Sequence, residues 1–318
     1  MSSHRSRYIP DATADYSHRF HAGNVGDVWK HCALIEVLRR LAVAAPTVRY
    51  VETHAGEGVY ALGATGEWSE GIGRLWSATD LGEGAVARYV SLCHRVAGSS
   101  ARPERYPGSP SLARAVLGPA ARLTLWEHDS AAFAQLAAHV ASAPNTRLVA
   151  GDGLAALAAA SDDVAVLTPD DDVAAVAPPD GVDPRTAATP DGSGGAPRLV
   201  VLVDPPWTQK ADWIAIPEAI ARAAVALPDA CLMLWYPVKS LTRPNAMHAR
   251  LAAAGVAATI AELITTPLTY RRNRLNGSGV LLVRPPAGAL EALAAAAPVI
   301  GRRCATSGGA WSSRMVAT

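Results

Sequence analysis

The stretch Leu199-Val-Val-Leu-Val-Asp204-Pro205-Pro206-Trp207 combines an uninterrupted apolar run with a polar end. Apolar residues that follow one another without alternation are typical of a strand that is buried on both faces, and such strands belong to parallel sheets covered by helices. The two prolines end the strand, because proline has no N–H group to donate within a sheet. The stretch therefore predicts a central strand whose carboxyl end carries polar residues at the edge where open α/β sheets bind ligands.

The same rhythm of short apolar runs and Ala- and Leu-rich helical stretches continues along most of the 318 residues. This alternation predicts an α/β fold with a mostly parallel, doubly wound sheet of seven strands. The expected strands are residues 47–52, 122–127, 146–150, 198–203, 230–236, 258–265 and 279–284. The expected helices are residues 26–44, 110–117, 130–141, 153–160, 212–226 and 245–253.

Two segments interrupt the alternation. Residues 60–107 are too long for one connecting helix, and a helical pattern at 85–97 favours a small, mainly helical insertion over the ligand-binding edge. Residues 161–197 are rich in Asp, Pro, Ala, Gly and Thr, so they bury too little apolar surface to offset their conformational entropy, and we expect a disordered acidic loop. The expected organisation is an N-terminal tail (1–15), one catalytic domain (16–300) and a C-terminal tail (301–318).

Composition and charge narrow the classes of protein. The net charge is +1, but residues 160–197 hold eight Asp and one Arg, which is a local charge of −7. The rest of the chain therefore carries +8, and a basic body of this kind suits a partner that bears phosphates. The four cysteines are far apart, which argues against a disulfide framework or a zinc site, so we expect no metal. The charged N-terminus predicts no secretory signal, and the lack of an apolar stretch of about 20 residues predicts no membrane span. We therefore expect a cytoplasmic protein, and we expect it to be monomeric.

Asp204, Pro205, Pro206 and Trp207 suit the methylation of an adenine N6 amine, whose lone pair is delocalised into the ring. A carboxylate and a backbone carbonyl that accept the two N–H groups favour tetrahedral geometry at the nitrogen, and proline stiffens that carbonyl. The aromatic side chain offers a face on which a base stacks. The alternative interpretation is an Asp-Pro turn that only ends the strand.

Three other strand ends carry residues that suit a nucleotide cofactor. Thr53-His54-Ala-Gly56 follows the first strand, and glycines there let the backbone approach a ligand, although His54 is equally well explained as a core histidine. Glu127 ends the second strand, where an acid commonly accepts hydrogen bonds from ribose hydroxyls. Asp152-Gly153 follows the third strand and is by itself also an ordinary turn. Because these groups follow successive strands, we expect them to share one crevice.

With these motifs in place, the chain resembles the RlmJ family, the 23S ribosomal RNA adenine-N6 methyltransferases of bacteria. The resemblance covers roughly residues 16–286 and is most distinctive in its N-terminal run and in Tyr106-Pro-Gly-Ser-Pro110. The motifs that carry it are Tyr16-Ser-His18-Arg-Phe20-His21-Ala22-Gly23-Asn24, Asp27-Val-Trp-Lys30-His31, Thr53-His54-Ala55-Gly56, Gly71-Ile-Gly-Arg-Leu-Trp76, Tyr106-Pro-Gly-Ser109-Pro110, Glu127-His128, Asp152-Gly153, Asp204-Pro205-Pro206, Leu234-Trp-Tyr-Pro237 and Gly277-Ser-Gly.

The resemblance implies a Rossmann-like class I methyltransferase that uses S-adenosyl-L-methionine and acts on 23S ribosomal RNA in its protein-free or early assembly form. It implies Asp204 as the catalytic carboxylate, Lys30 close to the cofactor, and Tyr16 and His18 at the mouth of the adenine pocket. The cofactor-binding residues that it implies, together with Gly56 of the glycine-rich turn, are His31, His54, Ser109, Glu127, Asp152 and Gly153.

The sequence departs from the family pattern at Trp207, where the family usually has Tyr, and in the long segment 161–197. Stacking survives the change to Trp, but a hydrogen bond from a Tyr hydroxyl does not. Three alternatives stay open: a DNA adenine-N6 methyltransferase, which would need base flipping, a non-catalytic RNA-binding protein with the same fold, and a nicotinamide dehydrogenase, which the absence of Gly-x-Gly-x-x-Gly disfavours.

Overall fold

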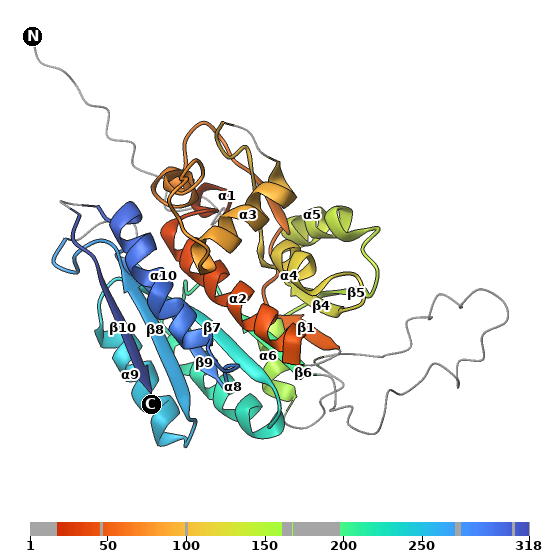
Figure 1. The fold of residues 1–318 in the computed structure, drawn as a ribbon. Helices are drawn as coiled ribbons and strands as arrows, with labels where there is room; N and C mark the ends of the chain where they lie inside the picture. Colours follow the sequence, from red (N-terminus) through yellow and green to blue (C-terminus); the bar gives the residue numbers. More distant parts are fainter. Residues whose placement is uncertain are drawn as a thin grey trace, which may run out of the picture.

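A computed structural model of the chain describes residues 18–44, 47–98, 101–160, 167, 198–270, 275–306 and 309–317 (Figure 1). An eight-stranded sheet in the order β10-β8-β9-β7-β6-β1-β4-β5 forms its middle layer. The neighbouring strands from β7 to β5 run parallel, whereas β7 with β9, β9 with β8, and β8 with β10 pair antiparallel. The strands are β1 Val48–Glu52, β4 Arg122–Glu127, β5 Thr146–Ala150, β6 Arg198–Val203, β7 Cys231–Val238, β8 Ala258–Ile264, β9 Gly277–Val283 and β10 Ser312–Ala317.

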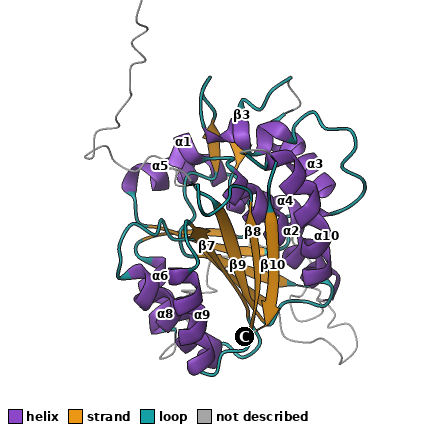
Figure 2. Ribbon diagram, turned by 90° about the vertical axis from the view of Figure 1, so that its left-hand side faces the viewer, coloured by secondary structure: helices purple, strands orange, loops and turns teal. Residues whose placement is uncertain are grey.

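All seven predicted strands lie in this sheet, and the predicted Rossmann-like α/β architecture is confirmed. Helices cover both faces (Figure 2): α2, α4 and α10 lie on one face and α6, α8 and α9 on the other. None of the helices in the described ranges is both long and apolar enough to span a bilayer. The helices are α1 His18–His21, α2 Val25–Ala44, α3 Ala85–Ala97, α4 Ser109–Leu117, α5 Ser130–Val140, α6 Gly153–Ala159, α8 Asp212–Ala226, α9 Thr242–Ala253 and α10 Ala289–Cys304.

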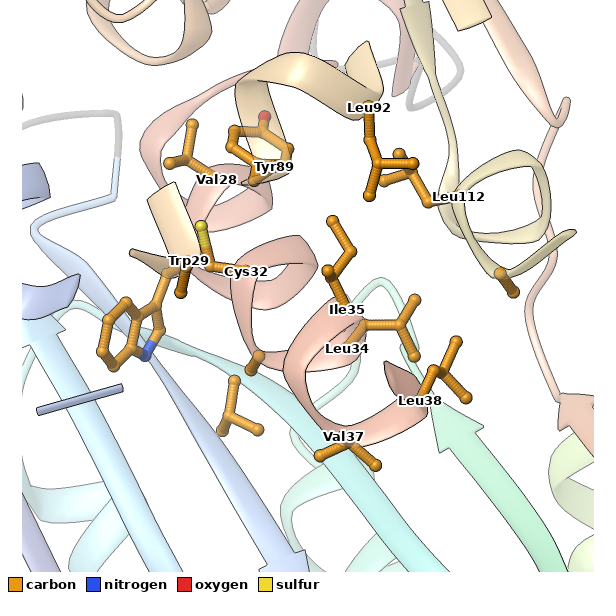
Figure 3. Close-up of a cluster of buried hydrophobic side chains, with 14 of the residues drawn as sticks. Val28, Trp29, Cys32, Leu34, Ile35, Val37, Leu38, Tyr89, Leu92 and Leu112 are labelled. Carbon is orange, nitrogen blue, oxygen red and sulfur yellow. The ribbon is translucent and has the colours of Figure 1, made fainter. Parts of the chain in front are cut away.

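Helix α2 is buried on nearly all sides because it lies between the sheet and the helices α3, α4 and α10. Its side chain Ile35 extends toward Leu112 of α4, and Val28 and Cys32 lie near Tyr89 of α3 (Figure 3). The indole Nε1 of Trp29 donates a hydrogen bond to the carbonyl of Ala261 in β8, at 3.0 Å. These contacts fix the rotation of α2 and therefore the direction of the next two residues, Lys30 and His31.

In the segment expected as a helical insertion, the structure has α3, two short 3₁₀ helices (Glu67–Glu70 and Ile72–Arg74) and a strand pair that we had not predicted. The pair consists of β2 Val59–Ala61 and β3 Arg105–Pro107, which run antiparallel. Arg88 of α3 binds the buried carboxylate of Glu36 in α2, with its Nε 2.8 Å from Oε1, and this ion pair ties the insertion to the central helix.

The prediction of a C-terminal tail at 301–318 is wrong for the residues that the structure describes there. Residues 301–304 complete α10, and β10 adds an eighth strand antiparallel to β8. Arg314 of β10 binds the buried Glu262 of β8 at 2.8 Å. The strand escaped prediction because Ser312–Ala317 is a half-exposed edge strand without an apolar run, and pairing with β8 rather than its own composition makes it a strand.

Residues 1–15 lie outside the described residues, and so does the segment 161–197 apart from Leu167. The expected N-terminal tail and acidic loop therefore concern parts of the chain that the structure does not describe.

Candidate functional site

A cleft of about 1590 Å³ lies at the carboxyl ends of β7, β6, β1, β4 and β5, which are neighbours in the sheet in that order. The loops after these strands supply its floor and walls, α2 contributes residues from its first two turns, and the insertion contributes Tyr60, Glu67 and Tyr106. The predicted crevice at successive strand ends is thus present, and it brings together most of the predicted site residues. Those that line it are Lys30, His31, His54, Gly56, Ser109, Glu127, Asp152, Asp204, Pro205, Pro206 and Trp207.

One side of the cleft, here called the acidic wall, consists of Glu57, Glu127, Asp129 and Asp152. The two carboxylate oxygens of Glu127 each accept a backbone N–H: Oε2 from Gly56 at 2.7 Å and Oε1 from Asp129 at 2.8 Å. Gly56 has a φ of +63°, and a Cβ there would lie 2.1 Å from the hydroxyl of Tyr60, so glycine is required at this close approach. The turn after β1 is therefore held directly against the acid that ends β4.

Asp152 and Gly153 follow β5, and they differ in their relation to the cleft. Asp152 caps α6, since its Oδ1 accepts from the N–H groups of Leu154 and Ala155 at 2.9 Å each. Gly153, predicted to bind the cofactor, does not line the cleft. A Cβ at Gly153 would lie 2.5 Å from the carbonyl oxygen of Thr53, so this glycine permits α6 to pack closely on the strand end.

The opposite side, here called the tetrapeptide wall, consists of Asp204–Trp207 with Trp213, Trp235, Lys239 and Arg243. Its centre is a buried chain of charges in which the Nζ of Lys30 lies 2.5 Å from Oδ2 of Asp204 and 2.8 Å from Oδ1 of Asp27. Burial alone would lower the pKa of Lys30, but the two carboxylates outweigh it and raise the pKa well above its ordinary value. Lys30 is therefore a permanent cation that fixes the orientation of Asp204.

The tetrapeptide itself makes a strained turn. Pro205 is buried and Pro206 exposed, and Trp207 has a φ of +55°, which is costly for a residue with a Cβ. The indole Nε1 of Trp207 donates to the carbonyl of Trp235 at 3.0 Å, and its ring lies 4.4 Å from that of Trp213. Strained backbone that surrounding contacts hold in place is typical of functional sites.

Glu52, the last residue of β1, is a fully buried carboxyl behind these groups. It accepts hydrogen bonds from the hydroxyls of Ser109 and Tyr50. Burial raises the pKa of Glu52 to about 8, helped by the nearby charge of Asp204 and opposed by the two hydrogen bonds and by Lys30. Ser109, predicted to bind the cofactor, thus has its hydroxyl engaged with Glu52.

The two predicted histidines are held by neighbouring hydroxyls. The Nδ1 of His31 lies 2.7 Å from the hydroxyl of Tyr106, which in turn contacts the hydroxyl of Tyr89. The Nδ1 of His54 lies 2.8 Å from Oγ1 of Thr53, and burial lowers the pKa of His54 against the opposing effect of nearby acids, Asp204 first among them. Both rings are therefore fixed at the cleft.

The short helix α1 contributes Arg19 and His21 to the lining of the cleft and is anchored by two acids. The Nε of Arg19 lies 2.8 Å from Oε1 of Glu57, and the Nδ1 of His21 lies 3.0 Å from Oε2 of Glu67. Of the residues predicted at the mouth of the adenine pocket, Tyr16 lies outside the described residues, and for His18 the structure describes the backbone alone.

The sequence analysis missed Asp27, Trp213, Trp235, Lys239 and Arg243 as site residues. A signal existed for Asp27 alone, which precedes Lys30 by three residues in one helix and therefore shares a face with it. The other four depend on how β7, the loop after it and the first turns of α8 and α9 meet around the tetrapeptide.

Comparisons with known proteins identify the family and the fold of the chain. The family described as ribosomal RNA large subunit methyltransferase D, RlmJ, matches residues 45–167 and 162–317. Two relatives named ribosomal RNA large subunit methyltransferase J, from Haemophilus influenzae and Escherichia coli, are each 28% identical over 277 residues, which cover 85% of this chain and 87% of the relative. A crystal structure of a Legionella pneumophila protein has a TM-score of 0.75 at 23% identity, covers 93% of this chain and 98% of its own, and shows the same fold.

Proposed function

This chain belongs to the RlmJ family of ribosomal RNA large subunit methyltransferases, and we propose that it transfers the methyl group of S-adenosylmethionine to the exocyclic N6 amine of an adenine in 23S ribosomal RNA. The family match confirms the resemblance found in the sequence and the class of enzyme that it implied. The DNA methyltransferase, the non-catalytic binding protein and the dehydrogenase are correspondingly disfavoured.

The observation that carries the proposal is the position of Asp204. Lys30 holds this carboxylate on the tetrapeptide wall, next to the strained turn of Trp207 and across the cleft from the acidic wall. Lys30 engages Oδ2, and Oδ1 is the oxygen that we assign to the first N–H of the adenine amine. The carbonyl of Pro205 accepts from the second N–H. These two acceptors aim the nitrogen lone pair, and the positive charge that develops on the amine is stabilised by Asp204.

The acidic wall fits S-adenosylmethionine, which supplies an electrophilic methyl group on a sulfonium when it is bound. Each oxygen of Glu127 uses one lone pair for a backbone N–H and keeps another that a ribose hydroxyl can donate to. Gly56 leaves room for the ligand, and Asp152, His54, His31 and Ser109 complete the binding residues, while Gly153 supports them from behind. Four carboxylates on this wall also favour a cationic ligand.

Asp204 acts through hydrogen bonding and charge, because a carboxylate is too weak a base to remove a proton from a neutral amine. The proton leaves after transfer, when the amine has become a strong acid. Lys30 is a positioning residue: by binding Asp204 and Asp27 together it fixes the carboxylate before the substrate arrives. Trp207 packs one side of its ring on Trp213 and offers the cleft side for stacking with the adenine.

The substrate we propose is protein-free 23S ribosomal RNA or an early assembly form, in the cytoplasm. The target adenine must leave its stack to reach Asp204, which costs least in RNA that ribosomal proteins have not yet locked in place. The test is methyl transfer from tritiated S-adenosylmethionine to protein-free 23S RNA, assembled large subunits and duplex DNA, followed by mass spectrometry of the product nucleoside.

We expect a single N6-methyladenine in the protein-free RNA, with little label in the other two substrates. The Asp204→Asn variant serves as the background control in each reaction. Equal labelling of duplex DNA, or methylation at N1 or C2 of adenine, would contradict the proposal.

A further inference from the structure

The cations of the cleft fall into two groups. Within the described residues, four Lys and Arg side chains line it, and two of them are engaged: Arg19 with Glu57, and Lys30 with Asp27 and Asp204. The other two, Lys239 and Arg243, are exposed and have no carboxylate partner in the part of the chain that the structure describes. Lys239 directly follows β7, Arg243 lies in the first turn of α9, and both lie on the tetrapeptide wall.

Arg243 is held in place by an aromatic ring. Its guanidinium carbon lies 6.0 Å from the ring centroid of Trp213, and the Trp213 ring lies 4.4 Å from that of Trp207. Stacking on an aromatic face restricts a guanidinium while leaving the N–H groups at its edge available as donors. A continuous chain of contacts therefore runs from the tetrapeptide to a cation whose donors are available for an anion.

The nearby acid does not neutralise this pair. Asp212, at the start of α8, accepts the backbone N–H of Gln209 through Oδ2 at 2.9 Å, and among the described residues it forms no ion pair with Lys239 or Arg243. The acidic wall lies on the other side of the cleft, beyond Asp204. The cleft thus has one wall rich in carboxylates and an opposite rim with two cations that lack a carboxylate partner among the described residues.

We propose that Lys239 and Arg243 bind the phosphates of the RNA backbone next to the target adenine, with Trp213 positioning the guanidinium of Arg243. S-adenosylmethionine has no phosphate and fits the acidic wall, so the anion that suits this rim belongs to the nucleic-acid substrate. Two cations at one rim hold the strand on both sides of an extruded nucleotide and keep the base directed at Asp204. This assignment rests on the proposed function, because it takes an RNA to be the occupant of the tetrapeptide wall.

The test compares the double variant K239A/R243A with R222A/R250A. The control removes the same charge from exposed positions of α8 and α9 that do not line the cleft. Binding of a 23S RNA fragment is measured as a function of potassium chloride concentration, alongside calorimetry with S-adenosylmethionine and steady-state kinetics.

For K239A/R243A we expect RNA affinity to fall about tenfold to a hundredfold, and the slope of log K against log salt to become shallower by roughly 1.4, or about 0.7 per single-strand phosphate contact. The KM for RNA should rise accordingly, kcat at saturation should change less than about threefold, and cofactor affinity should stay the same. The control should resemble the wild type in every measurement. Trp213→Leu should weaken RNA binding more in the wild-type background than in R243A, as expected of a residue that acts in part through Arg243.

An RNA affinity and salt slope equal to those of the control would overturn the proposal. A matching loss of S-adenosylmethionine affinity would assign the two cations to the cofactor instead, and an equal loss for duplex DNA would show a general polyanion surface. The binding measurements need no methyl transfer. An enzyme that fails to modify adenine would refute the proposed function, whereas the salt slope decides separately whether Lys239 and Arg243 bind RNA phosphates.

Discussion

Glu127 ends β4 and Asp204 follows β6, on the two sides of β1 in the sheet, yet the two carboxylates are held in different ways. Glu127 accepts the backbone N–H groups of Gly56 and Asp129, and Asp152 on the same wall accepts those of its own helix. Asp204 is bound by a side chain, Lys30, that is 174 residues away in the chain. Backbone donors suit the wall to which we assign the cofactor, a ligand of constant shape, whereas a buried lysine holds the carboxylate that we propose meets the reacting amine.

The largest effect is expected at the centre of the tetrapeptide wall. Asp204→Ala should lower kcat by more than about 1000-fold and leave the affinity for S-adenosylmethionine near that of the wild type, because the lost hydrogen bonds are needed mainly in the transition state. Single-turnover measurements and calorimetry check the two parts. A decrease in the single-turnover rate of less than about tenfold would remove Asp204 from its assigned role.

Lys30→Met should have the next largest effect, since it leaves Asp27 and Asp204 as neighbouring carboxylates without their cation. We expect kcat to fall about 100-fold because Asp204 loses its orientation, and the free energy of unfolding to fall by about 3 kcal/mol because a buried charge loses its partner. Urea unfolding and steady-state kinetics measure these changes.

The double variant D27N/K30M separates the two contributions. It should recover part of the lost stability, because one buried charge has been removed, without recovering kcat. Recovery of both would show that Lys30 acts on the fold alone.

On the acidic wall, Glu127→Ala should weaken S-adenosylmethionine binding by about 1.5–3 kcal/mol, because a charged acceptor of hydroxyl hydrogen bonds is lost. Asp129→Asn is the matched control: it removes the same charge but keeps a side chain that caps α5, so affinity should change less than about threefold. If calorimetry gives both variants the same affinity, the acidic wall attracts the cofactor only through its charge, and Glu127 has no specific hydrogen bonds to it.

Glu52, on β1 between the two walls, should affect activity least and be visible mainly in the pH dependence of stability. Its folded pKa is about 8 against 4.5 as the ordinary value, so the folded protein keeps a proton that the unfolded chain loses between these values. The stability contributed by Glu52 is therefore fully present below pH 4.5 and is lost as the pH rises to about 8.

Glu52→Gln, a neutral side chain of the same shape, should flatten the unfolding free energy between pH 4.5 and 8 relative to the wild type, at about 1.4 kcal/mol per unit of pKa shift removed. Its kcat should stay within about threefold. Parallel stability curves for the two proteins would contradict the raised pKa.

Much of the fold was predictable because its signals are local. Near-continuous apolar strands such as β6 and amphipathic stretches such as α3 follow from side-chain periodicity. An acid that ends a strand, such as Glu127, can be recognised in the sequence without knowing which groups it binds. Helix α10 was not predicted, although its Ala- and Leu-rich sequence carries a helical pattern. The eighth strand and the pair β2–β3 had weaker local patterns. They depend on pairing and packing that the rest of the fold provides.

By itself the sequence determined the seven strands from β1 to β9 of the main sheet and the helices between them, the family, and the strand ends at which the functional groups occur. Tertiary structure alone decided that Lys30 meets Asp204, that Arg243 stacks on Trp213, that Ser109 turns to Glu52, and that Gly153 lies behind the cleft rather than on its wall. The reason is physical: periodicity and turn chemistry act over a few neighbouring residues, whereas a charge pair between α2 and β6 exists only after the helix has packed on the sheet with its rotation fixed.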